Sequence, residues 1–296
     1  MREDRGVAKP IGRITRGTTG VNRLRRVDRW IAAQPVLRRA AEPLVVDLGH
    51  GASATTTVEL WRRLAAVRPE VEVVGVEIDP ERVRLASEQL AQLAGRESVR
   101  SEGDRRPDPL PGADSPRERP AVSFRLGGFE VPLDGRDATV IRAMNVLRQY
   151  GESEVADAWA RLRGRLQPGG LLVEGTCSED GRIGAWATLD AEGPRTLTLG
   201  LRLASIGSAA LESPGVVAER LPKALIHRNV PGEPIHAFLL DLDRAWAAAA
   251  PLGVYGPTQR WIATATALRE RWPIAGDRSR WRLGELTVDW AAVAPS

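Results

Sequence analysis

Cysteine, lysine and histidine are scarce in this chain of 296 residues. The single cysteine, Cys177, excludes an internal disulfide framework and a zinc site built from clustered cysteines. With only three histidines as well, we predict no metal centre. The basic residues are nearly all arginine, because Lys9 and Lys223 are the only lysines, and the formal net charge of +4 is too small to indicate nucleic acid binding by itself.

Long apolar runs are also missing. No stretch approaches the roughly 20 apolar residues of a membrane span. The charged N-terminus lacks the apolar core of a signal peptide. The sequence therefore predicts a cytoplasmic protein with no membrane partner, and its length allows one large core or a domain with extensions.

Two short apolar segments, residues 44–46 and 73–76, have the β-branched and aliphatic composition of buried parallel strands. An amphipathic stretch lies between them, so the three segments predict a β-α-β unit. Gly49 and Gly51 follow the first strand and let the chain turn tightly against a ligand, because neither carries a Cβ. Open α/β sheets bind ligands at this end of their strands.

Glu77 ends the second strand, and its carboxylate can accept hydrogen bonds from both hydroxyls of an unphosphorylated ribose. The spacing Asp47-x-Gly49-x-Gly51, together with Glu77, resembles the cofactor signature of class I S-adenosylmethionine-dependent methyltransferases. Ser53 stands at the third glycine position of that signature. A nicotinamide-binding fingerprint fits less well, because it has Gly-x-Gly-x-x-Gly with no acid on the strand.

The resemblance extends over residues 42–205, which we predict to form the S-adenosylmethionine-binding domain. Residues 137–147 resemble the fourth strand of the family, and residues 166–175 resemble the link into its fifth strand. Residues 185–201 are typical of an antiparallel hairpin, with which the family closes its sheet. The predicted fold class is α/β, with a Rossmann-like, doubly wound and mostly parallel sheet.

A basic N-terminal arm, residues 1–41, precedes this domain, and a helical C-terminal extension, residues 206–296, follows it. Residues 11–30 combine an apolar helical face with threonines and arginines, so we predict that they pack over the cofactor cleft. A solvated basic tail is the alternative. Residues 95–120 are rich in charged residues, proline, glycine and serine, which predicts a disordered insertion.

The resemblance implies that the cofactor is S-adenosylmethionine and that residues following three strands bind it. These residues are Asp47, Gly49, His50, Gly51, Glu77, Ile78, Gly128 and Phe129. Asp47 and Glu77 are interpreted as cofactor residues and not as catalysts, because methyl transfer mainly requires that the acceptor be held against the methyl group. The alternative is that both acids only cap turns at the strand ends.

Catalysis is expected to involve Asn145, His227 and His236. Asn145 lies where the resemblance places an acceptor-facing motif, and a structural turn is its alternative role. The two histidines fall in a proline-rich loop, where imidazole can take a proton near neutral pH. Arg228 in the same loop suits an acidic substrate group. The alternative is a polar surface loop without a role in catalysis.

The sequence does not identify the methyl acceptor: a small molecule is favoured, and RNA is the alternative. The Asn/Asp-Pro-Pro-Tyr/Phe motif of enzymes that methylate exocyclic amines is absent from the position of Asn145. Thr176-Cys177-Ser178 resembles a segment of RNA cytosine-5 methyltransferases, but this chain has no second cysteine. A protein that keeps the fold without transfer activity, for example one that binds RNA, is the alternative from another class.

Overall fold

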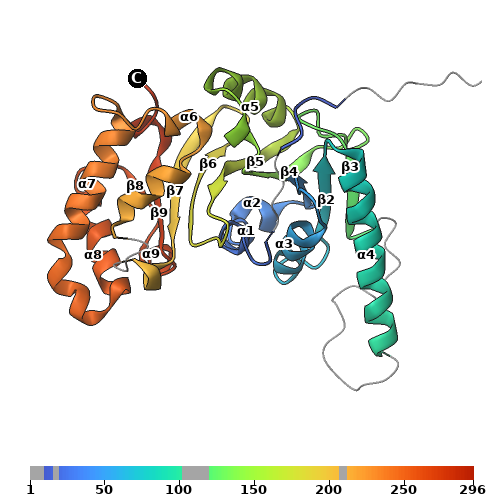
Figure 1. Ribbon diagram of the computed structural model, residues 1–296, viewed down its shortest axis with the longest axis horizontal. Helices are drawn as coiled ribbons and strands as arrows, with labels where there is room; N and C mark the ends of the chain where they lie inside the picture. The colour runs from blue at the N-terminus through green and yellow to red at the C-terminus, as the bar shows by residue number, and fades with distance from the viewer. Residues whose placement is uncertain (1–9, 16–19, 102–119, 207–211) are drawn as a thin grey trace, which may run out of the picture.

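The structure, a computed structural model, describes residues 10–15, 20–101, 120–206 and 212–296, without the side chains of residues 94–101. Within these ranges the chain forms one nine-stranded sheet with helices on both faces (Figure 1). The strand order is β3-β2-β1-β4-β5-β6-β7-β9-β8. The predicted fold class is therefore confirmed.

The first five strands are parallel and form the half of the sheet that carries the predicted motifs. Val45 pairs with Val73 on one side and with Val140 on the other, so the first strand is central. All of its residues are buried, as expected for a strand with both faces covered. The parallel strands are β1 (Leu44–Leu48), β2 (Glu72–Glu77), β3 (Val122–Leu126), β4 (Ala138–Met144) and β5 (Leu166–Cys177).

Successive residues of the parallel strands contact different helix layers. Val45 belongs to an apolar cluster with Ile31 and Leu60, whereas Val46 belongs to a cluster with Leu162. The sheet is therefore doubly wound. The first layer contains α1 (Arg25–Ala32), α2 (Pro35–Arg39), α3 (Thr55–Ala65) and α4 (Pro80–Ser101), and the second contains α5 (Val155–Arg163).

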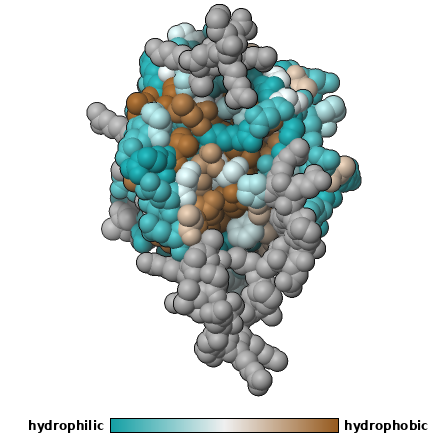
Figure 2. Space-filling view, turned by 90° about the vertical axis from the view of Figure 1, so that its right-hand side faces the viewer, coloured by the Kyte–Doolittle hydropathy of each residue, from teal (hydrophilic) through white to brown (hydrophobic). Residues whose placement is uncertain are grey.

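Helix α4 packs beside the edge strand β3 at one end of the molecule. Asp79 caps it, because its Oδ1 accepts a hydrogen bond of 3.0 Å from the backbone N–H of Glu81. The face on this side carries apolar residues in its middle and polar residues around them (Figure 2). Residues 95–101 continue α4, in contrast to the predicted disordered insertion, because one glycine costs a helix only about 1 kcal/mol. The rest of that predicted insertion, residues 102–119, lies outside the described residues.

The other half of the sheet is antiparallel. The predicted hairpin is confirmed as β6 (Ile183–Leu189) and β7 (Pro194–Leu201). The C-terminal extension is mainly helical, but it also adds β9 (Glu285–Asp289) beside β7 and β8 (Ile274–Ala275) beside β9, which the sequence analysis did not predict. Its helices are α6 (Lys223–Ile226), α7 (Pro234–Ala248), α8 (Pro257–Arg269) and α9 (Arg278–Trp281).

Short 3-10 helices connect these elements. Those that matter for the site are η1 (Leu147–Gln149), which follows β4, and η4 (Pro214–Arg220), which precedes α6. The others are η2 (Glu152–Glu154), η3 (Leu203–Ser205), η5 (Ala250–Tyr255) and η6 (Trp290–Ala292). None of the helices in the described ranges is long and apolar enough to cross a membrane. The same ranges hold no cluster of three or more histidine, cysteine or acidic side chains arranged to bind a metal ion.

Candidate functional site

The turn after β1 requires glycine at two positions. Gly49 and Gly51 have φ angles of 70° and 81°, in the left-handed region that favours glycine. A Cβ at Gly49 would also lie 2.8 Å from Cγ2 of Val146. The predicted glycine turn therefore exists, and it brings backbone groups to the carboxyl ends of the parallel strands, where open α/β sheets bind ligands.

Glu77 is held rigidly at the end of β2. Its Oε2 accepts a hydrogen bond of 3.0 Å from the backbone N–H of Gly51, and its Oε1 accepts one of 3.0 Å from that of Ile78. Arg82 lies 3.7 Å from Oε2 and supplies a compensating charge. Oε1 also accepts a longer hydrogen bond of 3.4 Å from the backbone N–H of Asp79, whereas Oε2 of this buried carboxylate keeps a second acceptor position for a hydroxyl group.

A narrow cleft runs along the ends of β1, β2 and β3, and we call it the nucleoside cleft. It brings together five of the residues predicted to bind the cofactor, which are Gly49, Glu77, Ile78, Gly128 and Phe129. Its walls also include Leu48, Val76, Gly127, Val146 and Tyr150. Segments more than 70 residues apart in sequence thus line one cleft.

Residues 11–13 and Thr15 of the N-terminal arm line the nucleoside cleft, whose remaining volume is about 20 Å³. The carbonyl oxygen of Ile11 accepts a hydrogen bond of 2.8 Å from the backbone N–H of Phe129, and the N–H of Ile11 donates one of 2.8 Å to Oε2 of Glu130. The N–H of Arg13 donates to the Tyr150 hydroxyl at 2.6 Å. Residues 11–13 therefore do not trail in solvent, and they enter the cleft further than the sequence analysis predicted.

Asp47 forms part of a buried ion-pair cluster. Nη2 of Arg142 lies 2.7 Å from Oδ2 of Asp47, Nη1 of Arg142 binds Asp28, and Arg63 also binds Asp28 at 3.0 Å. Burial raises the pKa of Asp28 to about 6, although the positive charges of Arg142 and Arg63 oppose this shift. The cluster joins α1 to β4 and β1. A direct contact between Asp47 and the cofactor stays a prediction.

His50 packs underneath the glycine turn. Its ring lies edge-on to Phe124 with 4.9 Å between centroids, and a Cβ at Gly75 would be 3.1 Å from its Cδ2. Neither ring nitrogen has a hydrogen-bond partner in the part of the chain that the structure describes. Burial lowers the pKa of His50, against the opposing effect of Asp47 and Glu77, which disfavours the protonated ring. Binding of the cofactor by His50 stays a prediction.

Asn145, at the end of β4, has a φ of 64°, which is uncommon for a residue other than glycine. Its backbone N–H donates to the Gly175 carbonyl at 2.7 Å. Its Oδ1 accepts from the Cys177 N–H at 3.0 Å, and its Nδ2 donates to Cys177 Sγ at 3.4 Å. These contacts fix the amide, and strained residues of this kind cluster at functional sites. Cys177 itself is buried behind Asn145.

A second, larger cleft of about 1040 Å³ opens beside the nucleoside cleft, and we call it the acceptor cleft. The two clefts share Thr15 and Gly49 in their walls. Asn145 lines the acceptor cleft together with three predicted cofactor residues, Asp47, His50 and Gly51. Three further residues of this cleft, Arg23, Arg148 and Arg220, were not predicted from the sequence, because arginine is so abundant in this chain that its distribution carries little signal.

The structure does not bring His227 and His236 to either cleft. His227 Nε2 lies 3.0 Å from Lys223 Nζ, and His236 Nδ1 lies 3.0 Å from Asn229 Oδ1. Arg228, expected to suit an acidic substrate, forms ion pairs with Glu152 at 2.7 Å and Glu233 at 3.3 Å. A role for either histidine in proton transfer stays a prediction.

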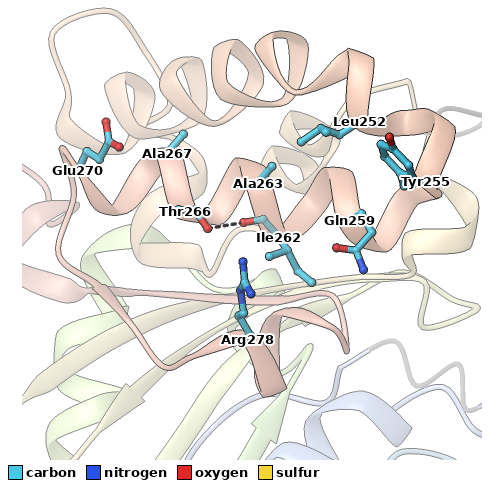
Figure 3. Close-up of a pocket in the computed structure, with 9 residues that line it drawn as sticks. All are labelled: Leu252, Tyr255, Gln259, Ile262, Ala263, Thr266, Ala267, Glu270 and Arg278. Atoms are coloured by element: carbon cyan, nitrogen blue, oxygen red, sulfur yellow. Dashed lines mark hydrogen bonds between the residues drawn. The ribbon is translucent and has the colours of Figure 1, made fainter.

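A separate hollow of about 790 Å³ lies on the C-terminal helices (Figure 3). Its walls come from η5, α8 and α9 and include Leu252, Tyr255, Ile262 and Arg278. It contains no residue from the strand ends, and nothing in the structure indicates an occupant. The two clefts at the carboxyl ends of the parallel strands are therefore the candidate functional site.

No protein-family model and no curated protein matches the chain. The similar solved structures include several methyltransferases. An O-methyltransferase family protein from Burkholderia thailandensis matches at 16% identity over 52% of this chain and 38% of its own, with a TM-score of 0.32. Human N-acetylserotonin methyltransferase, in complex with SAM, matches at 19% identity over 54% of this chain and 36% of its own, with a TM-score of 0.32. The CcbJ methyltransferase from Streptomyces caelestis matches at 22% identity over 62% of this chain and 67% of its own, with a TM-score of 0.34.

The chain thus spans well under half the length of the first two of these proteins. At such identities and TM-scores the likeness identifies neither a family nor a substrate.

Proposed function

We propose that this chain is an S-adenosylmethionine-dependent methyltransferase. The observation that carries the proposal is the fixed carboxylate of Glu77, which faces the nucleoside cleft beside the glycine turn of Gly49 and Gly51. The acceptor cleft adjoins it at Gly49, so a nucleoside in one cleft and an acceptor in the other would meet at the end of β1. Asn145 lies on the acceptor side of this junction.

The contacts of Ile11 indicate what the nucleoside cleft is built to bind. Ile11 offers one hydrogen-bond donor, taken by Glu130, and one acceptor, used by the Phe129 N–H. The Watson–Crick edge of adenine offers the same pair, an amino donor next to a ring-nitrogen acceptor. An adenine could therefore replace the peptide of Ile11 without leaving Phe129 or Glu130 unpaired. Once residues 11–13 leave the nucleoside cleft, the residues of the cleft fit S-adenosylmethionine.

In this proposal Glu77 accepts hydrogen bonds from the ribose hydroxyls, and Phe129 and Glu130 bind the adenine. When bound, S-adenosylmethionine supplies an activated methyl group. The task of the chain's own residues is then to hold the acceptor in line with it and to exclude water. Asn145 suits the first task, because two hydrogen bonds to Cys177 fix its side chain at the cleft wall. We favour a small-molecule acceptor, because the concave shape and volume are close to those of small-molecule sites, with RNA as the alternative.

Calorimetry with S-adenosylhomocysteine tests the proposal. We expect the wild type to bind it and Glu77→Ala to bind more weakly by about 1–3 kcal/mol, the range for a hydrogen bond to a charged group. Glu81→Gln is the control, because Glu81 is exposed on α4 and lies in neither cleft. Absence of binding by the wild type, or equal affinity of the wild type and Glu77→Ala, would refute the proposal.

Limited proteolysis tests whether the cofactor displaces the arm. The backbone N–H of Arg13 is bound to Tyr150 while its side chain is exposed, so trypsin can cut after Arg13 once the segment leaves the cleft. We expect saturating S-adenosylhomocysteine to accelerate this cleavage several-fold, as followed by mass spectrometry. Cleavage after Arg39, which is exposed at the end of α2, should not change. An unchanged rate after Arg13 would show that the arm and the cofactor do not compete.

A further inference from the structure

Three arginines from separate segments converge on the acceptor cleft. Arg23 precedes α1, Arg148 lies in η1 after β4, and Arg220 ends η4. Arg23 is anchored on the cleft wall, because its Nε donates a hydrogen bond of 3.2 Å to the Ser178 carbonyl. Positive charge is thus concentrated next to Asn145, where the proposed acceptor would lie.

Arg148 and Arg220 have no carboxylate partner in the part of the chain that the structure describes. Nε of Arg220 is buried without any hydrogen-bond partner there. Partial burial and then the neighbouring charges of Arg220 and Arg23 lower the pKa of Arg148, although Glu219 opposes this. Guanidinium groups that repel one another at a cleft wall cost stability, and a bound anion relieves that cost.

The acidic residues of the acceptor cleft do not cancel this charge. Asp47 is paired with Arg142 at 2.7 Å, and Asp180 is paired with Arg182 at 3.0 Å. Burial lowers the pKa of His50, which disfavours a positive charge on its ring. Among the described residues that line the cleft, Glu179 is the remaining acid, against three arginines, so these residues carry an excess of positive charge.

We propose that the methyl acceptor carries a carboxylate or phosphate group and that Arg148 and Arg220 bind this group. This inference rests on the proposed function, since it assigns the acceptor cleft to the substrate of methyl transfer. A small anion fits better than RNA, because Glu179 lines the same cleft and would repel the successive phosphates of a polynucleotide.

Thermal unfolding of the full chain saturated with S-adenosylhomocysteine tests the inference. Inorganic phosphate and succinate serve as the two probes, each compared with sodium chloride at equal ionic strength. Binding to the folded state raises the Tm with anion concentration, and the titration gives an apparent Kd. We expect one or both anions to raise the Tm of the wild type more than chloride does. A larger increase in Tm with phosphate indicates a phosphate site, and a larger increase with succinate indicates a carboxylate site.

Arg148→Gln and Arg220→Gln should each weaken the binding of the anion about tenfold, as expected for loss of one charge-assisted hydrogen bond. Arg278→Gln is the matched control, because Arg278 also lines a hollow, on the C-terminal helices (Figure 3). Calorimetry with S-adenosylhomocysteine shows that the variants fold. It also separates the two hypotheses, because a failure of the wild type to bind it refutes the proposed function whatever the anions do.

The inference would be overturned if phosphate and succinate raised the Tm no more than chloride does. It would also be overturned if Arg278→Gln weakened anion binding as much as Arg148→Gln and Arg220→Gln do. A 20-nucleotide RNA provides the last comparison. If the RNA binds with steep salt dependence, the double variant Arg148→Gln/Arg220→Gln abolishes that binding, and neither small anion acts, the cleft binds a polynucleotide and the inference is wrong.

Discussion

Replacement of Arg142 by methionine is expected to lower the free energy of unfolding by about 3–5 kcal/mol, the cost of breaking a buried ion pair by removing one partner. The guanidinium of Arg142 is fully buried and binds Asp28 and Asp47, whose side chains are buried as well. It also donates a hydrogen bond of 3.2 Å to the Thr56 carbonyl. Without Arg142, the carboxylates of Asp28 and Asp47 remain buried, and only part of their negative charge is still balanced, by Arg63.

Urea unfolding of the wild type and of Arg142→Met measures this effect. Arg84→Met is the control, because Arg84 forms its ion pairs with Glu81 and Glu88 on the exposed surface of α4, where they contribute little. Arg142→Met should also release the arm, since Asp28 lies in α1, and should therefore speed tryptic cleavage after Arg13. Equal stability of Arg142→Met and the wild type would show that the buried cluster does not hold α1 on the sheet.

Glu174→Gln is expected to remove a large pH dependence of stability. Glu174 lies in β5 with none of its surface exposed, and neither carboxyl oxygen has a hydrogen-bond partner among the residues that the structure describes. Burial raises its pKa from 4.5 to about 8, and the nearby Trp159 indole offsets only part of this shift. At a pH between 4.5 and about 8, Glu174 therefore keeps its proton in the folded state, whereas it has lost it in the unfolded chain.

Stability due to Glu174 is therefore fully present below pH 4.5 and is lost as the pH rises toward 8. A shift of this size corresponds to about 5 kcal/mol. Because glutamine resembles the protonated acid, Glu174→Gln should match the wild type near pH 5 and exceed its stability by several kcal/mol near pH 9. Glu192→Gln, at an exposed position, is the control. A stability difference that does not change with pH would contradict a buried, uncompensated carboxyl at position 174.

The parallel half of the sheet was predictable because its signals are local. The strand at residues 44–46, the turn of Gly49 and Gly51, and the acid at Glu77 occupy one short stretch, and each residue type has few alternative roles. The hairpin of β6 and β7 was predictable for the same reason, since a short turn joins its strands. These elements are confirmed by the strand order and pairing.

The features that the sequence did not reveal depend on contacts between distant segments. Ile11 enters a cleft whose far wall is Phe129, and no local pattern encodes that pairing. Strand β8 has only two residues, and β9 pairs with β7 from a distant part of the chain. The buried ion-pair cluster could have been predicted from Arg142. An arginine inside an apolar strand requires buried acidic partners, and Asp47 is one of them.

A crystal structure of the chain with S-adenosylhomocysteine is the most direct test of the proposed function. We predict that the ribose hydroxyls lie within hydrogen-bond distance of Glu77, that the backbone N–H of Phe129 donates to the adenine, and that Ile11 has left the nucleoside cleft. The sulfur should face the acceptor cleft next to Asn145. A ligand bound elsewhere, with the Phe129 N–H still donating to the Ile11 carbonyl, would contradict the assignment of both clefts.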